Sequence, residues 1–66
     1  MNGQSKRNAL APVLAIALKF PGERANVLAN VVRYEMRNAR PVAPDYVERL
    51  QFMGRALERL HGARTL

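Results

Sequence analysis

The sequence predicts an all-helical protein, in which a short N-terminal helix precedes a helical hairpin within one domain over residues 1–66. Two observations predict this class. Apolar side chains recur at alternating spacings of three and four residues, which places them along one face of a helix. Proline and glycine interrupt the chain at Pro21-Gly22 and between Pro41 and Pro44, and segments of helical length lie around these breaks. We expect a flexible arm over residues 1–7, followed by helices over residues 8–19, 22–40 and 45–61.

The first helix is expected to be short and buried. Asn8 can cap its N-terminus, and Pro12 falls near its first turn, where proline is best tolerated. From Ala9 to Leu18, apolar side chains surround the whole circumference. A helix that is apolar all round is usually buried all round. Because a chain of 66 residues has few other elements to cover such a helix, we expect it to lie in a dimer core or against a partner protein.

The second helix has one polar face and two apolar lines. Its polar residues recur at spacings of three and four between Glu23 and Arg40, and Leu28 and Val32 belong to a core face opposite them. A second apolar line lies beside the polar stripe and comprises Val27, Val31 and Tyr34. One hairpin partner cannot cover both lines, which again indicates self-association or a partner.

The third helix follows a stiff double-proline turn. Asp45 and Glu48 resemble a capping box, and Gly62 is a natural residue to end the helix. Gly54 borders the apolar face and would let another helix approach closely. That face is formed by Tyr46, Leu50, Met53, Leu57 and Leu60.

Phe52 does not belong to that face. Successive residues of a helix are rotated by about 100° about its axis, so Phe52 points away from Leu50 and lies among Glu48, Arg55 and Arg59. One interpretation is that a single exposed aromatic has no role. The other is that Phe52 is contact surface, because aromatic and arginine side chains are enriched at binding hot spots.

The composition argues for binding and against catalysis. Eleven Lys and Arg against five Asp and Glu leave a net charge of +6, which favours nucleic acid or an acidic protein surface as a partner. The chain has no cysteine and a single histidine, His61, whereas a structural zinc site needs four such ligands. It also lacks a glycine-rich phosphate loop. We therefore expect no enzymatic activity, no metal and no cofactor.

The apolar stretch from Ala9 to Leu18 is not expected to cross a membrane. It has ten residues, whereas a membrane-spanning helix needs about 20. The absence of cysteine fits a reducing compartment. We expect a cytoplasmic protein that does not contact a membrane.

Two classes of partner compete. Nucleic-acid binding would use Arg33, Arg37 and Arg40, with Lys6 and Arg7 on the arm, and would weaken steeply with salt. Acidic residues on the third helix would repel phosphates, and the rigid double-proline turn differs from that of a helix-turn-helix. Protein binding explains more features, because the excess apolar side chains describe a surface that one small monomer cannot bury.

The order of features resembles a known class of small phage proteins. An apolar first helix leads through Phe20-Pro21-Gly22-Glu23 to an arginine-bearing helix and a capped third helix. In size and character the chain is similar to the phage anti-quorum-sensing proteins, helical-hairpin dimers that block a LuxR-type transcription activator and can also inhibit a pilus-assembly ATPase. The resemblance implies a host-takeover inhibitor that binds a regulatory protein in the bacterial cytoplasm.

These arguments predict two sets of functional residues. The partner-binding set consists of aromatic and arginine side chains: Phe20, Arg33, Tyr34, Arg37, Phe52 and Arg55. The second set forms the core and an intertwined or face-to-face homodimer, and all its members are aliphatic or methionine: Leu10, Leu14, Leu18, Leu28, Val31, Val32, Leu50, Met53, Leu57 and Leu60.

Overall fold

The computed structural model describes the backbone of residues 1–65 and the side chains of residues 1–62. Its elements are three helices: α1 (Gly3–Lys19), α2 (Glu23–Arg37) and α3 (Pro44–Thr65). No strand occurs within the described backbone. The expected all-helical class is confirmed.

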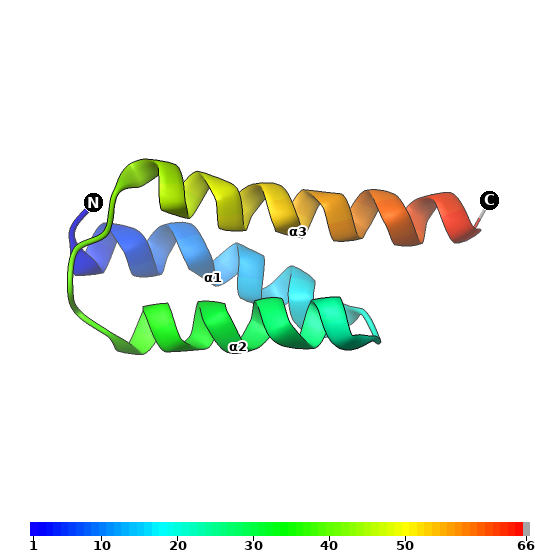
Figure 1. The fold of residues 1–66 in the computed structure, drawn as a ribbon, viewed down its shortest axis with the longest axis horizontal. Helices are drawn as coiled ribbons and strands as arrows, with labels where there is room; N and C mark the ends of the chain where they lie inside the picture. Colours follow the sequence, from blue (N-terminus) through cyan, green and yellow to red (C-terminus); the bar gives the residue numbers. More distant parts are fainter. Residues whose placement is uncertain (66) are drawn as a thin grey trace.

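The helices lie side by side with α1 in the middle (Figure 1). The helix α2 runs antiparallel to α1, whereas α3 runs parallel to it. The main contacts join α1 to α2 and α1 to α3, and α2 touches α3 much less. The principal hairpin is thus formed by α1 and α2, whereas the sequence led us to pair the second and third helices.

The N-terminus differs from the expected flexible arm over residues 1–7. The side chain of Asn2 caps α1 by accepting a hydrogen bond from the Ser5 backbone N–H at 2.8 Å, so the helix begins at Gly3 rather than near Asn8. The Met1 ammonium group donates to the Val42 carbonyl at 2.7 Å, and the Val42 N–H donates to the Met1 carbonyl at 3.1 Å. These bonds hold the chain start against the α2–α3 connection.

The helix α1 is not buried all round, contrary to our expectation. Leu10, Val13 and Ala17 are buried, but Ala15 and Leu18 are exposed. The neighbours α2 and α3 cover the first group. Within the apolar stretch, the exposed residues are Ala11, Pro12, Ala15 and Leu18, so one large apolar side chain of α1 stays in solvent. Because the longer helix begins at Gly3, Pro12 lies inside it rather than near its first turn.

The ends of the other helices also differ from the expected bounds. The helix α2 ends at Arg37, and Arg40 lies in the following connection, where its N–H donates to Asn38 Oδ1 at 3.0 Å. Asp45 lies in the first turn of α3 instead of preceding it, and α3 continues past Gly62. Gly22, before α2, has a φ of 104°, a conformation that glycine adopts without strain.

The core lies between α1 and its two neighbours. On α3 it includes Val47, Leu50 and Leu57. Gly54 is buried against α1, as expected of a glycine that borders another helix, but a Cβ added there would lie 3.5 Å from Val13 Cγ1, which is an ordinary contact.

Candidate functional site

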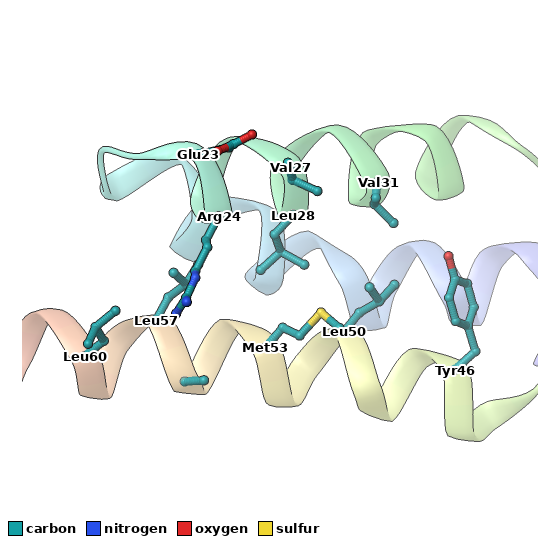
Figure 2. A pocket seen from close by; sticks show the side chains of 11 residues that line it. Glu23, Arg24, Val27, Leu28, Val31, Tyr46, Leu50, Met53, Leu57 and Leu60 are labelled. Atoms are coloured by element: carbon teal, nitrogen blue, oxygen red, sulfur yellow. The ribbon is translucent and has the colours of Figure 1, made fainter.

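An apolar groove of about 690 Å³ runs between α2 and α3. It forms because both helices pack on α1 and leave the space between them on the other side unfilled (Figure 2). Side chains of α2 line one wall: Glu23, Arg24, Val27, Leu28 and Val31. Side chains of α3 line the other: Tyr46, Leu50, Met53, Ala56, Leu57 and Leu60.

The floor of the groove is part of the core, and its walls are exposed. Leu28, Leu50 and Leu57 are buried at its base. Val27 and Met53 on the walls are 52% and 50% exposed, although both are apolar. Apolar side chains gathered in a concave surface indicate a binding site more strongly than the same side chains scattered singly.

Two charged residues lie at the α2 N-terminal end of the groove. Figure 2 shows the Arg24 side chain extending towards α3, whereas the Glu23 carboxylate points away from α3. No hydrogen bond or ion pair joins the Arg24 guanidinium to another side chain in residues 1–62. The groove therefore carries a positive charge at this end.

A polar cluster around the buried Glu35 carboxylate lies near the opposite end, and it includes Tyr46. The Glu35 carboxylate is surrounded by three donors: Lys6 Nζ at 3.3 Å from Oε1, Arg40 Nη2 at 3.3 Å from Oε2, and the Tyr46 hydroxyl at 3.0 Å from Oε2. Lys6 Nζ also donates to the Arg40 carbonyl at 2.8 Å. Lys6 is fully buried and Glu35 is 2% exposed. We call these four residues the Glu35 cluster.

Burial and the contacts within the cluster shift the pKa values of Glu35 and Tyr46. Burial alone would raise the pKa of Glu35, but hydrogen bonds from Tyr46 and Lys6 and the positive charges of Arg40 and Lys6 outweigh it, so the pKa is lowered from 4.5. Burial, together with the hydrogen bond to Glu35 and its negative charge, raises the pKa of Tyr46. Glu35 is thus held ionised, and Tyr46 is held as a neutral donor.

A ring stack joins the turn after α1 to α3 beyond the other end of the groove. The rings of Phe20 and His61 are parallel within 5°, with centroids 4.4 Å apart. Phe20 is half-buried, so part of its ring is occupied within the chain and is less available to a partner than the sequence suggested.

The other residues of the predicted partner-binding set do not form one site. Tyr34 is exposed and lines a small hollow with Arg37, while Arg33 is half-buried and donates to Asn30 at 3.2 Å. Phe52 and Arg55 are exposed on α3 and belong to neither this hollow nor the groove. Their role in binding stays a prediction.

The predicted core and dimer set divides into three groups by burial. Five members are buried: Leu10, Leu28, Val32, Leu50 and Leu57. Leu14 and Val31 are half-buried, and Leu18, Met53 and Leu60 are exposed. Six of the ten line the groove: Leu28, Val31, Leu50, Met53, Leu57 and Leu60. The homodimer stays a prediction: α2 and α3 cover the Leu10 face of α1, whereas Leu18 is exposed on the same helix.

Sequence reasoning missed the Glu35 cluster and Val47, the first buried residue of the α3 core face. Lys6 and Glu35 are 29 residues apart, and no local pattern connects them. A signal for Val47 was present, since Val47, Leu50, Gly54 and Leu57 also recur at spacings of three and four. This line faces α1, and the line chosen from the sequence, which begins at Tyr46, faces the groove.

Searches for other kinds of site and for relatives add no assignment. No helix in the described part of the chain is long and apolar enough to cross a membrane. Within the same residues, no group of three or more His, Cys, Asp or Glu side chains is placed to hold a metal ion. Comparisons with protein-family models, curated proteins and solved structures find no match. The groove and the charges around it are therefore the features that bear on function.

Proposed function

We propose that this protein acts by binding, not by catalysis, and that the α2–α3 groove receives an apolar helix of another protein. The observation that carries this proposal is the exposure of Val27, Met53 and Leu60 around a buried leucine floor. Covering these side chains would remove apolar surface from water, which is the main favourable term in protein association.

The shape of the groove suits a helix. Its α3 wall extends from Tyr46 to Leu60, and these 14 residue steps correspond to about 21 Å at the rise of an α-helix. A partner helix of about four turns has the same length. Helices of this kind bind grooves through apolar side chains at positions i, i+3 or i+4, and i+7.

The resemblance to phage anti-activators supplies a candidate biological role. In that role, the partner would be a bacterial transcription regulator of the LuxR type, with a pilus-assembly ATPase as a second target, and binding would inhibit it. In this proposal, a helix of the regulator occupies the groove, and its capture inhibits the regulator.

The placement of the basic side chains supports nucleic-acid binding less well. Of the five basic residues expected to contact phosphates, Lys6 is buried against Glu35, and Arg40 pairs with the same carboxylate. Phosphate contacts need accessible cations. Arg7, Arg33 and Arg37 remain, and Arg33 is half-buried.

Site-specific photo-crosslinking in bacteria tests the proposal. A photoreactive amino acid at Val27 is expected to capture a discrete, nuclease-resistant protein, and the same amino acid at Leu18 is not. Val27 lines the groove, whereas Leu18 lies on α1 outside it, and the two are similarly exposed at 52% and 56%.

A pair of substitutions makes the test specific to the groove. Met53→Asp is expected to abolish capture at Val27, whereas Leu18→Asp leaves it unchanged. Each places a charge at a half-exposed apolar position, so their effects on folding are similar, and thermal unfolding of both variants checks this. Equal capture by the two variants, or capture that nuclease removes, would contradict protein binding in the groove.

A further inference from the structure

We propose that the occupant of the groove is an acidic amphipathic helix of a different protein, and that one of its carboxylates pairs with Arg24. This inference rests on the proposed function, which requires only that some helix bind there. The inference further specifies that the bound helix is acidic and that Arg24 is the residue that recognises it.

Arg24 is placed so that its guanidinium can pair with a carboxylate of a helix in the groove. The Arg24 side chain lines the groove together with Leu28, Leu57 and Leu60, and it has no ion-pair partner within residues 1–62. A guanidinium offers a planar set of donors that matches a carboxylate and can bind it in bidentate fashion. A bound helix would exclude water around this pair, which strengthens the attraction. Glu23, the other charged residue of the groove, points away from α3 (Figure 2).

The charge of the whole chain, which is +6, supports the same inference. Two copies docked groove to groove would bring two such charges together, and their repulsion opposes a homodimer. An acidic partner would be attracted instead. Arg55 and Arg59 are exposed on α3, and neither forms an ion pair with a described acidic side chain, so they add to the field that steers such a partner.

Together these observations describe the sequence that the groove would select. The partner helix would have about four turns, with apolar residues every three or four positions to cover Val27 and Met53. At the end that meets Arg24, it would carry Glu or Asp beside the apolar line. Basic residues at this position would be rejected, because they would face an uncompensated guanidinium.

Fluorescence anisotropy with two synthetic peptides and the full chain tests the inference. One peptide is an amphipathic helix with glutamates bordering its apolar face, and the other has lysine in place of each glutamate. The glutamate peptide is expected to bind at least about tenfold more tightly. Arg24→Glu is expected to remove or reverse this preference.

Arg7→Glu provides the matched control for the charge reversal. It changes the net charge by the same amount, but Arg7 is exposed on α1 and does not line the groove. If Arg24 contacts the carboxylate, Arg24→Glu has a much larger effect than Arg7→Glu. If both variants lose the same affinity, only the overall field matters, and the assigned contact is wrong.

The remaining outcomes separate this inference from the proposed function. Equal binding of the two peptides, with Val27 crosslinking still abolished by Met53→Asp, overturns the acidic partner and leaves helix binding intact. A homodimer in sedimentation velocity that Met53→Asp dissociates also overturns it, because a second copy then fills the groove. Peptide binding that a DNA duplex displaces and Met53→Asp does not affect overturns both proposals.

Discussion

The two ends of the space between α2 and α3 differ in the contacts that line them: paired charges and hydrogen bonds at one end, and exposed apolar side chains towards the other. At one end, the Glu35 cluster joins α1, the α2–α3 connection and α3 through a carboxylate with three donors. Towards the other end, α2 and α3 face each other across exposed apolar side chains, among them Val27, Met53 and Leu60. Tyr46 belongs to both regions, because its hydroxyl donates to Glu35 while its side chain lines the groove.

The difference shows which contacts make this small chain adopt one particular packing of its helices. Ionised groups are costly to bury unless they are paired and hydrogen-bonded, so the Glu35 cluster favours the one arrangement that satisfies all its members. No buried side-chain nitrogen or oxygen in the described part of the chain lacks a partner. Apolar contacts are less directional, and Val27 and Met53 in the groove stay about half exposed.

The largest expected effect follows from removing the carboxylate. Glu35→Leu leaves the Lys6 ammonium buried without its counter-ion, which we expect to cost about 3–5 kcal/mol in the free energy of unfolding. Urea unfolding followed by circular dichroism measures it. The double variant Glu35→Leu, Lys6→Met is expected to recover much of the loss, since no buried charge is then left unpaired. Full stability of the single variant would show that the cluster does not hold this end together.

The start of α1 is expected to be the next most sensitive position. A Cβ on Gly3 would lie 2.7 Å from the Ala39 carbonyl oxygen. This oxygen belongs to the backbone, so it cannot move aside as the end of a flexible side chain can. We expect Gly3→Ala to destabilise the protein by about 1–3 kcal/mol, although alanine favours helices, because the α2–α3 connection must shift. The same urea experiment measures the change. A stabilised variant would indicate that this contact is easily relaxed.

Acid is expected to weaken the same end by a smaller amount. Because the folded-state pKa of Glu35 lies below its ordinary value of 4.5, its contribution to stability is full above that pH and is lost as the pH falls through the lowered pKa. The stability difference between the natural chain and Glu35→Gln should therefore shrink between neutral pH and pH of about 3.

A matched comparison identifies the source of this pH dependence. Asp45 pairs with Arg49 at 3.9 Å, but both side chains are at least 70% exposed. Asp45→Asn is therefore expected to leave the acid limb of the stability profile unchanged. An equal loss of pH dependence in both variants would mean that the effect does not come from burial of Glu35.

The smallest effect is expected where α3 crosses α1. A Cβ at Gly54 would meet Val13 Cγ1 at 3.5 Å and Ile16 Cδ1 at 3.7 Å, which are ordinary contacts. Gly54→Ala should therefore stabilise the protein by about 0.5–1 kcal/mol through helix propensity. Thermal unfolding measures the gain. Gly3→Ala is the contrasting substitution, because its added Cβ meets backbone. If Gly54→Ala also lost stability, the contact between α1 and α3 would tolerate no added atom.

The sequence located three helical segments and the apolar lines along them, but not the start of α1 or the ends of α2 and α3. Prolines and glycines marked the breaks near Pro21 and Pro44. The line through Val27 and Val31, recognised as surplus on the second helix, became one wall of the groove, and the line from Tyr46 to Leu60 became the other. These features are local, because spacing along a helix decides which side chains share a face.

Only the tertiary structure decided which faces meet. Periodicity did not show that α1 would lie between its neighbours, or that Val47 and not Tyr46 would begin the buried line of α3. It also placed Lys6 on a flexible arm, whereas the fold buries it against Glu35. These outcomes depend on contacts between residues far apart in the chain, where packing and the pairing of buried charge outweigh local preference. The groove is the space between α2 and α3 that this packing leaves open.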